Sequence, residues 1–568
     1  MDNQDVANIF NEIADILELK NENQFRVLTY RKAARTIENL PQTVSSAGKI
    51  PGVGEDLTQK IDEILKTKHL KFLDKMRKSI PSGLIEMLNI PGMGPKTISK
   101  LNQKFGIKTI ADLEKILASH KIAKLKGFGA QSEENICEGI KQYKRHISRF
   151  PLGIIYPKAQ EIVNTLKKVS GVKKVDLAGS IRRQKETIGD IDILCTSLNP
   201  LAIIEKFCSL EDVKKIKEKG KTKAVVILRS GVEADLRVLS PESYGAALHY
   251  FTGNKDHNIK IRSIGAKKGL KINEYGVFRK LKSKNEKGKT ETRVGGKTEK
   301  EIFNAVNLPY IEPELREDRG EIEAAFEHKL PHLIQLSDIK GDLHIHTNYS
   351  EGINTIEEMA REAIKMGYEY ILISDHTTTV GITHGMDEKK ILRQMKEIDK
   401  INKAFRGQRL GFRVLKGVEC DIRADSSLDL PDKILAQLDI VIGAIHSKFK
   451  MDQTARLIKA CQNKNIDIIA HPTGRLLGKR DPYEVDLDKV MDECKKTNTC
   501  LELNAHWSRL DLSDINCLKA KQKGIKIAIS TDAHSVTQLN MMKFGISTAR
   551  RGWLEKKDVI NTSSTLDF

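Results

Sequence analysis

The stretch Asp176–Leu194, DLAGSIRRQKETIGDIDIL, decides the fold around it and indicates its chemistry. It begins with a Gly-Ser turn and ends in an alternating pattern typical of a β-strand, on which Asp190 and Asp192 lie two residues apart. Side chains two apart on a strand share a face, so the two carboxylates project together. Adjacent carboxylates repel each other unless a cation lies between them, and a divalent metal that also binds phosphate oxygens fits there. The pattern predicts a nucleotidyl-transfer centre.

Residues just before these carboxylates offer groups suited to a triphosphate. Gly179 lets the backbone approach phosphates closely, while Ser180 and Arg183 offer hydrogen-bond donors. An Asp-x-Asp pair alone is common on solvated strands, but the Gly-Ser turn shortly before GDID favours the functional interpretation. The alternating segment VEADLRV adds a third carboxylate. We therefore predict that the catalytic residues, which hold two Mg²⁺ ions, are Asp190, Asp192 and Asp235.

The charge of the chain is unevenly distributed. The net charge of the 568 residues is +20, of which +17 falls in residues 1–340 and +3 in residues 341–568. The basic part is the one that carries the Asp-x-Asp site, as expected of a protein that binds a phosphate backbone. This charge distribution favours a nucleic acid as partner.

The cysteines and the apolar runs bear on the cellular compartment. Eight cysteines lack any C-x-x-C spacing, which favours reduced, buried thiols in a cytosolic protein. The N-terminus, MDNQDVANIF, has neither a basic region nor an apolar core, and no long apolar run follows. We expect a cytoplasmic monomer that does not contact membranes.

Three similar turns recur in the helical N-terminal region: IPGVG at 50–54, IPGMG at 90–94 and LKGFG at 125–129. Each precedes a segment of helical periodicity, so its glycines expose backbone N–H groups at a helix N-terminus, which suits a DNA phosphate. One G-x-G is weak evidence, because it also fits a tight interhelical turn, but three copies on a basic chain favour DNA binding without base recognition. The predicted contact residues are Gly52, Gly54, Gly92, Gly94, Gly127 and Gly129.

From residue 339 onward, strand, loop and helix patterns alternate, and apolar runs end in potential metal ligands. A β/α barrel gathers the C-terminal ends of its strands at one mouth, so these side chains would converge. Mixed histidine and carboxylate ligands favour Mn²⁺ or Zn²⁺, with up to three ions. The nine predicted ligands are His344, His346, Glu351, His376, Glu419, His446, His471, Asp532 and His534. The nearby Arg475, Lys479 and Arg480 are candidate contacts to DNA phosphates.

The motifs GSIRR, GDIDIL, VEADLRV, YFTGN and KGLKINEYGVF, in this order, resemble the palm and thumb of a family X DNA polymerase. The region after residue 338 resembles the polymerase-and-histidinol-phosphatase (PHP) domain of bacterial and archaeal members. The resemblance covers nearly the whole chain and implies gapped or nicked DNA and dNTPs as partners. It implies that an incoming nucleotide contacts Gly189, Tyr250, Phe251, Gly253 and Asn258, and that Arg262 faces the template strand.

The resemblance extends to the small N-terminal domain, where Tyr30 and Lys60 match a pocket tyrosine and a Schiff-base lysine of the family. Phe25 and Asp56 depart from the histidine and second lysine usual there. An activated amine needs neighbouring positive charge, and Asp56 acts in the opposite sense. We therefore expect Lys60 to bind a 5′-phosphate rather than to perform lyase chemistry.

The expected architecture is multidomain. It combines α-helical helix-hairpin-helix domains, an α+β nucleotidyltransferase palm and thumb, and a C-terminal α/β PHP domain folded as a distorted β/α barrel. The predicted segments are 1–80 (lyase-like), 81–150 (fingers-type), 151–240 (palm), 241–315 (thumb-type), 316–338 (linker) and 339–568 (PHP).

The leading functional hypothesis is a DNA-directed DNA polymerase that fills short gaps in base-excision-type repair. Its PHP domain would add metal-dependent 3′–5′ exonuclease and AP endonuclease activity. Three alternatives remain: a PHP domain that is a metal-stabilised scaffold without turnover, a DNA-end-binding protein without activity, and a nucleotidyltransferase acting on RNA or small molecules.

Overall fold

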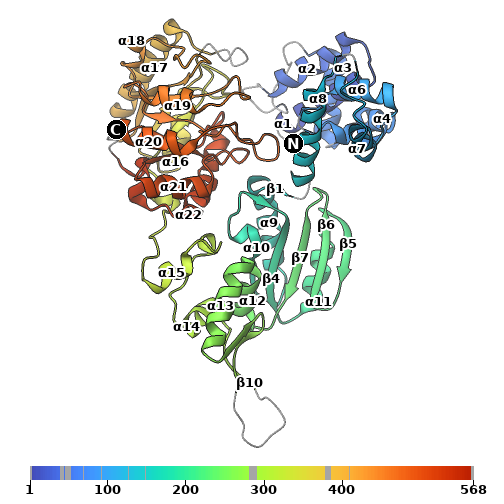
Figure 1. Cartoon of the computed structure of the whole chain (residues 1–568), viewed down its shortest axis with the longest axis vertical. Helices are drawn as coiled ribbons and strands as arrows, with labels where there is room; N and C mark the ends of the chain where they lie inside the picture. Colours follow the sequence, from blue (N-terminus) through green and yellow to red (C-terminus); the bar gives the residue numbers. More distant parts are fainter. Residues whose placement is uncertain are drawn as a thin grey trace, which may run out of the picture. The chain divides into compact units, whose positions relative to one another are not determined.

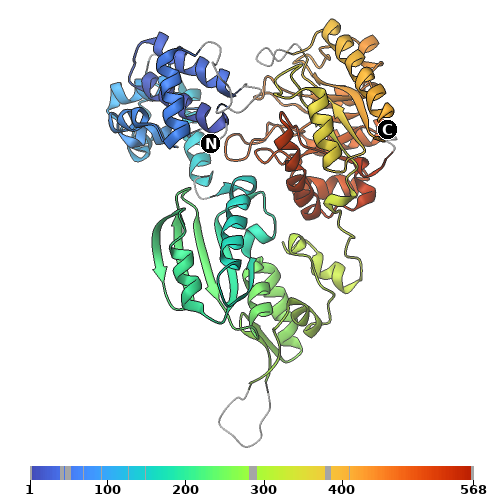
Figure 2. The same ribbon diagram turned by 180° about the vertical axis from the view of Figure 1, so that it is seen from behind.

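The computed structural model describes residues 3–38, 44, 53–67, 69–90, 92–125, 127–146, 149–280, 291–377, 385–408 and 410–564. The chain forms two compact units. The first comprises residues 1–148 with 351–355, and the second comprises residues 149–350 with 356–568 (Figures 1 and 2). No helix in these described ranges is long and apolar enough to cross a membrane.

The first unit is helical and has two apolar cores. One core, which includes Phe10, Tyr30 and Ile64, lies among the first four helices: α1 (Asn3–Leu19), α2 (Gln24–Glu38), α3 (Glu55–Thr67) and α4 (Lys71–Lys78). The other, which includes Met87 and Leu101, lies among the next four: α5 (Ser82–Met87), α6 (Pro95–Phe105), α7 (Ile110–Ala118) and α8 (Ala130–His146). The apolar periodicity along this region thus produces two small helical bundles.

The palm of the second unit is a five-stranded sheet of order β2-β4-β7-β6-β5. Its strands are β2 (Val172–Leu177), β4 (Asp190–Ser197), β5 (Val213–Lys219), β6 (Lys223–Leu228) and β7 (Glu233–Val238). A short pair, β1 (Phe150–Pro151) and β3 (Thr187–Ile188), lies beside it, and its helices are α9 (Leu152–Lys167), α10 (Gly179–Arg182) and α11 (Pro200–Cys208). Alternate residues of β4, such as Ile191 and Ile193, join the core formed with α9 and α11, which leaves the carboxylates on the other face.

The thumb follows and begins with two helices, α12 (Tyr244–Thr252) and α13 (Lys255–Lys267). Its further elements are β8 (Leu270–Asn273), β9 (Gly276–Lys280), β10 (Glu291–Gly295) and α14 (Glu299–Ala305). Strands β8, β9 and β10 form an antiparallel sheet in the order β10-β9-β8. The short elements η1 (Pro313–Leu315), α15 (Glu321–Phe326) and η2 (Leu336–Asp338) lead to the next domain.

The C-terminal domain is a barrel-like parallel sheet, as the alternating strand and helix patterns predicted. Seven strands follow in sequence order: β11 (Gly341–Ile345), β12 (Tyr370–Ile373), β13 (Arg413–Asp421), β14 (Ile440–Ala444), β15 (Ile468–Ile469), β16 (Cys500–Asn504) and β17 (Ile527–Ser530). The helices are α16 (Ile356–Lys365), α17 (Glu388–Gly407), α18 (Asp432–Leu435), α19 (Thr454–Cys461), α20 (Leu487–Thr497), α21 (Asp514–Lys523) and α22 (Met542–Arg551), and the 3₁₀ turns are η3 (Val536–Met541), η4 (Lys556–Asp558) and η5 (Ile560–Thr562). A parallel bridge between Ile345 and Ala533 brings the first strand beside the last, so the sheet is nearly closed.

Candidate nucleotidyl-transfer and metal centres

The three predicted palm carboxylates lie together on one face of the sheet. Strands β4 and β7 run parallel, with Asp192 opposite Asp235 and Asp190 opposite Glu233. Opposed residues of neighbouring strands have adjacent side chains, so the register places the third carboxylate beside the first pair. Strand alternation in the sequence predicts that Asp235 can lie beside the first two aspartates, and the register shows that it lies opposite Asp192.

Electrostatics at this face favour a bound cation. Burial, together with the charges of Asp190 and Asp235, raises the pKa of Asp192 to about 7, because a carboxylate among others resists ionisation. Burial also raises the pKa of Asp235, against the lowering effect of Arg237. Among the described residues, Asp235 Oδ1 is buried and has no hydrogen-bond partner. An unsatisfied buried oxygen between repelling carboxylates fits divalent metal ligation.

Gly179 starts the short helix α10 directly against Asp192. Its φ is +60°, and a Cβ there would lie 2.1 Å from Asp192 Oδ2. Any other residue would therefore displace the metal-site carboxylate. The sequence indicated glycine here for close approach to a triphosphate, and the structure adds close approach of the carboxylate itself.

Arg183, the predicted triphosphate donor, is already engaged in the structure. Its Nε donates to Glu317 Oε1 at 2.9 Å, and its Nη1 donates to the carbonyl of Thr252 at the end of α12. Gly253 follows that carbonyl with φ +69°, and a Cβ there would lie 3.2 Å from Arg183 Nη1. Residues 179–183 of the palm, here called the nucleotide loop, therefore meet the YFTGN turn of the thumb at this guanidinium.

The remaining predicted nucleotide and template contacts lie around the same turn. Tyr250 is partly exposed, and its ring packs edge-on against that of Phe251, with 5.2 Å between the ring centroids. The guanidinium of Arg237 lies 4.7 Å above the Phe251 ring and also contacts Asp235, so it links the aromatic pair to the carboxylates. Asn258 is buried and donates to the carbonyl of Tyr250 at 2.7 Å. Three further predicted contacts are less buried. Ser180 and Gly189 are partly buried, and Arg262 is exposed on α13.

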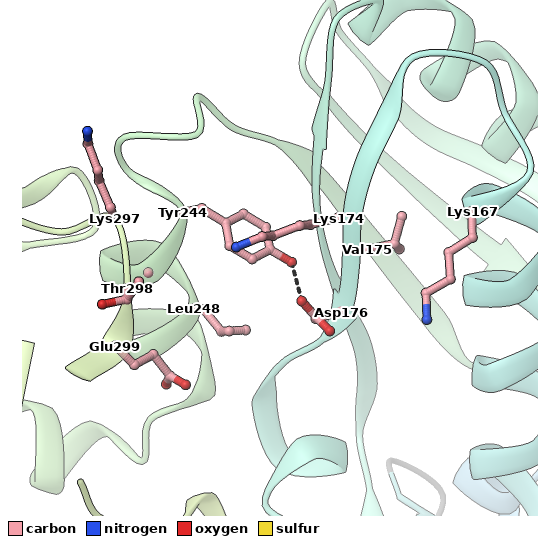
Figure 3. Close-up of a pocket in the computed structure, with 10 residues that line it drawn as sticks. Lys167, Lys174, Val175, Asp176, Tyr244, Leu248, Lys297, Thr298 and Glu299 are labelled. Carbon is pink, nitrogen blue, oxygen red and sulfur yellow. Dashed lines mark hydrogen bonds between the residues drawn. The ribbon is translucent and has the colours of Figure 1, made fainter. Parts of the chain in front are cut away.

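A cavity of about 420 Å³ is lined by residues of the palm and the thumb, none of which belongs to the predicted nucleotidyl-transfer site. Tyr244 donates to Asp176 within it, and the amine of Lys174 lies 5.4 Å above the Tyr244 ring. Figure 3 shows Lys297 on the thumb side of this cavity and Lys167 on the palm side.

The barrel brings most of the predicted metal ligands together. Three overlapping groups have ligand atoms within 4.8 Å of one another: His344 with His346 and Glu419, His346 with His376 and His534, and His376 with Glu419 and His446. His471 Nε2 lies 3.0 Å from Glu419 Oε1, and Asp532 Oδ1 lies 3.1 Å from His346 Nε2. Eight of the nine predicted side chains are therefore adjacent at the ends of the strands. Glu351 belongs to the segment that groups with the first unit, and its role as a ligand stays a prediction.

The members of this cluster differ in how their surroundings shift their pKa values. Burial, with the charges of His534 and His376, lowers the pKa of His346 to about 3, which leaves a neutral imidazole able to bind a metal. Burial opposes ionisation of Glu419, but the charges of His376, His446 and His344 hold the pKa of its carboxyl well below the usual range. Imidazoles that lose their protons on ligation, together with ionised carboxylates, form a donor set that could hold Mn²⁺ or Zn²⁺.

Sequence reasoning missed the residues that orient these ligands. Glu502 accepts a hydrogen bond from Nδ1 of His344 at 2.7 Å and another from the backbone N–H of His471 at 2.7 Å. Asp421 Oδ1 lies 3.2 Å from Nδ1 of His446. Carboxylates that hold Nδ1 direct Nε2 toward a metal. The only local signal was that both are acidic residues on buried segments of barrel strands.

Asp375 and Arg475 have structural partners in the barrel. Asp375 accepts hydrogen bonds from the hydroxyls of Thr347 and Ser350 and from the amide of Gln394, so it secures a loop beside His376. Arg475 was a candidate contact to DNA phosphates. That interpretation is corrected, because its buried guanidinium donates to Glu186 and to backbone carbonyls.

The N-terminal turns place glycines before helices, as predicted. Gly54, Gly94 and Gly129 immediately precede α3, α6 and α8, and a Cβ at any of them would meet nothing within 4 Å. The second and third turns line one hollow of about 230 Å³, which contains Gly92 and Gly127 together with Lys96, Thr97, Lys100, Phe128, Ser132, Asn135 and Ile136. The predicted contact Gly52 lies outside the described residues.

Lys60 has an acidic neighbour one helical turn away, Asp56. Its amine contacts Asp56 and lies 5.0 Å above the Phe72 ring, which in turn stacks on Tyr30. Burial and the charge of Asp56 raise the pKa of Tyr30 to about 12. That Lys60 binds a 5′-phosphate stays a prediction.

The fold and the two centres define a nucleotidyltransferase joined to a histidine-rich metallohydrolase barrel. Four family descriptions match: "Helix-hairpin-helix domain" over residues 1–70, "SAM-like Helix-hairpin-helix tandem" over 84–142, "DNA polymerase beta thumb" over 247–317 and "PHP domain" over 342–506. The chain is 38% identical over 575 residues to the DNA polymerase/3′-5′ exonuclease PolX of Bacillus subtilis (strain 168), covering 100% of this chain and 98% of that protein. The chain therefore belongs to the family X DNA polymerases that carry a C-terminal PHP domain.

Two further relatives each match one part of the chain. A probable phosphatase of Thermoanaerobacter sp. (strain X514) is 32% identical over 238 residues, which is 39% of this chain and 89% of that protein. DNA polymerase lambda of Rattus norvegicus is 27% identical over 326 residues, or 52% of this chain and 53% of that protein. The family assigned from sequence is thus confirmed, together with its helix-hairpin-helix, thumb and PHP parts.

Proposed function

We propose that this chain fills short gaps in DNA with dNTPs at the palm and removes 3′-terminal nucleotides, and cleaves at abasic sites, at the barrel. The observation that carries the polymerase part is the register that sets Asp192 beside Asp235. The observation that carries the nuclease part is the set of three overlapping ligand groups at the barrel mouth. The name of the Bacillus subtilis relative, a DNA polymerase and 3′-5′ exonuclease, supports both.

At the palm, Asp190, Asp192 and Asp235 would hold two Mg²⁺ ions, which when bound lower the pKa of a primer 3′-hydroxyl and neutralise a triphosphate. The chain itself binds and orients the nucleotide. Ser180, Gly189 and Arg183 donate to phosphate oxygens, while Tyr250 and Phe251 pack against the sugar. Asn258 would contact the minor groove of the base after its hydrogen bond to the Tyr250 carbonyl breaks. Arg262 would contact the template strand.

At the barrel, the histidines and carboxylates would hold up to three Mn²⁺ or Zn²⁺ ions, which supply Lewis acidity for phosphodiester hydrolysis. Glu502 and Asp421 fix the Nδ1–H tautomers of His344 and His446, so that their Nε2 atoms are the ligating atoms. The strongly acidic Glu419 keeps a negative charge at the centre of the group.

The helix-hairpin-helix turns would hold the DNA backbone. Backbone N–H groups at the start of a helix bind phosphate. Gly54, Gly94 and Gly129 have open space where a side chain would be, and none needs a positive φ. No contact inside the described part of the chain explains glycine at these positions, whereas the approach of a phosphate does. Lys60 would bind the 5′-phosphate of a gap.

The test is a labelled one-nucleotide gap incubated in Mn²⁺ with and without dNTPs. We expect extension when dNTPs are present and shortening of the same primer when they are absent. Extension without shortening would support the alternative in which the PHP domain is a scaffold. Shortening without extension would contradict the assignment of the palm.

A further inference from the structure

The palm and the barrel belong to one compact unit and share a packed interface. Leu510 and Phe544 of the barrel are buried within the palm core. Gly153 at the start of α9 approaches Trp507 so closely that a Cβ at residue 153 would lie 2.2 Å from the Trp507 Cβ. The barrel and the palm therefore pack tightly against each other through buried apolar side chains.

The polar part of this interface concentrates on one short palm segment, residues 183–186. Arg551 Nη1 donates to the Arg183 carbonyl at 2.7 Å, and the Ser547 hydroxyl donates to Gln184 Oε1 at 3.0 Å. Arg475 donates to Glu186 at 2.7 Å. This segment connects α10, which begins at the Gly-Ser turn, to the strands that lead into the metal-site carboxylates. Three barrel side chains thus fasten the connection between the nucleotide loop and the carboxylate strand.

Arg551 has the most consequential position of the three. Its side chain is 3% exposed and donates to Asp514 Oδ2 at 2.7 Å and to Glu317 Oε1 at 2.9 Å. Glu317 Oε1 also accepts from Arg183 Nε at 2.9 Å. Two guanidinium groups, one from the barrel and one from the nucleotide loop, therefore share a single carboxylate oxygen.

We infer that Arg551 is a positioning residue for nucleotide binding in the palm, acting through Glu317 and the Arg183 backbone. The inference rests on the proposed role of Arg183 as a triphosphate ligand. Arg551 competes for the oxygen that holds Arg183 and fixes the carbonyl of the same residue. The barrel thereby sets how firmly Glu317 retains the guanidinium that the incoming triphosphate must recruit.

Loss of Arg551 has a definite physical consequence. Glu317 would then be neutralised by Arg183 and by Lys185, whose amine lies 3.9 Å away. A carboxylate with one fewer cation binds the remaining cations more strongly, so Arg183 would leave it less readily for a triphosphate. The 183–186 backbone would also lose an anchor. Both effects weaken dNTP binding without removing a metal ligand.

The experiment is steady-state gap filling by the full-length chain with Arg551→Ala. We expect the KM for dNTP to rise about tenfold, equivalent to about 1.4 kcal/mol, with kcat within about twofold of the parent. Arg551→Lys, which retains the charge, should recover part of the KM. The 3′-nuclease should remain active, which shows that the barrel is folded.

The matched control is the neighbouring Arg550→Ala. Arg550 also ties helix α22 to the thumb tail, through Glu314 at 2.7 Å and the Ile334 carbonyl at 3.1 Å, but it makes neither of the Arg551 bonds to Arg183 and Glu317. An equal KM rise in both variants would mean that domain docking alone matters, and would overturn the inference. An unchanged KM in Arg551→Ala would overturn it as well.

Two further variants keep the outcome decisive. Arg183→Ala tests the proposed function itself. If it leaves the dNTP KM unchanged, the palm assignment is wrong, whereas a raised KM there with a parental KM in Arg551→Ala defeats only the inference. If Arg551→Ala does not fold, Glu186→Ala is the alternative variant. It removes the ion pair between Arg475 and residues 183–186 by changing Glu186, the more exposed partner. It should raise the KM about threefold, and an unchanged KM there would contradict the role of the barrel.

Discussion

At the scale of single residues, Asp192→Asn is the sharpest test of the palm. The side chain lies against Gly179 and opposite Asp235, and the amide replaces the charge while keeping the shape. We expect nucleotide addition to fall by at least about 10²–10³-fold, the usual loss when a charge that stabilises the transition state is removed. Affinity for gapped DNA should change little, which a binding titration measures alongside the primer-extension rate.

The matched control for this substitution is Asp176→Asn. Asp176 is a carboxylate on the neighbouring strand β2 that is bound by the Tyr244 hydroxyl rather than grouped with the catalytic trio. Its conversion should leave extension within a few fold of the parent rate. Normal extension by Asp192→Asn would remove Asp192 from the catalytic set.

Single residues also show where sequence reasoning stops. The barrel histidines could be predicted because each follows an apolar strand, and strand ends meet at one mouth. Glu502 could not be assigned its role, because its partner His344 lies 158 residues earlier in the chain. Arg551 contacts the Arg183 carbonyl from 368 residues away, and local sequence holds no sign of that contact. Roles that depend on long-range partners require the fold.

At the scale of elements, the second and third helix-hairpin-helix turns can be tested by Gly94→Ala with Gly129→Ala. Both positions are open and need no positive φ, so methyl groups there should leave stability within about 1 kcal/mol of the parent. They would nevertheless obstruct a phosphate at the start of α6 and of α8. We expect the Kd for gapped DNA, measured by fluorescence anisotropy, to rise at least about tenfold, because hydrogen bonds to charged groups are strong.

A second glycine-to-alanine change provides the control for that element. Gly407, at the end of α17 in the barrel, is equally open and should tolerate alanine with no effect on DNA affinity. Gly54→Ala should weaken binding less than the double variant, because α3 begins with Glu55 and Asp56, which repel phosphate. Unchanged DNA affinity in the double variant would show that these turns are only interhelical joints.

Elements with strong periodicity were predictable, and those shaped by packing were less so. The Lys-rich hairpin of β5 and β6 and the seven barrel strands follow from alternation and apolar runs. Helix α9 begins at Leu152 and continues through Pro157, because Leu152 and Ile155 are buried in the palm core. Strand β10 (Glu291–Gly295) pairs with β9, and the intervening residues 281–290 lie outside the described ranges.

At the scale of the whole molecule, the Glu317 ion pairs make the stability of the second unit depend on pH. Burial opposes ionisation, but the charges of Arg551 and Arg183 lower the pKa of Glu317 to about 2. A group with a lowered folded pKa contributes stability above its ordinary pKa of 4.5 and loses it as pH falls toward 2. At about 1.4 kcal/mol per unit, the contribution reaches about 3 kcal/mol.

Thermal unfolding at a series of pH values measures this contribution. Glu317→Gln should melt well below the parent at pH 6, and the difference should shrink progressively between pH 4.5 and pH 3 as the parent carboxylate becomes protonated. Glu312→Gln, an exposed position in the same segment, is the control and should show no such convergence. A difference that stays constant with pH would mean that the charge of Glu317 does not stabilise the fold.

The two catalytic centres share no ligand, so their reactions should separate by mutation. The palm carboxylates precede residue 236, and the metal cluster at the barrel mouth lies wholly after residue 338. We expect His344→Ala or Asp532→Ala to abolish Mn²⁺-dependent 3′-end removal and cleavage at abasic sites, because each leaves a metal group short of a ligand. Gap filling should remain measurable in both, and Asp190→Ala should retain the nuclease while losing extension.

The scaffold alternative predicts a different pattern on the same substrates. It requires that the parent show no metal-dependent cleavage, and that His344→Ala lose stability and polymerase activity together, because the barrel braces the 183–186 segment of the palm. Melting curves recorded with both assays distinguish loss of a ligand from loss of the fold. A nuclease that survives in both His344→Ala and Asp532→Ala would place the activity outside this barrel. Loss of gap filling at an unchanged melting temperature would instead show that the metal cluster itself, and not only the Arg551 contact, is coupled to the palm.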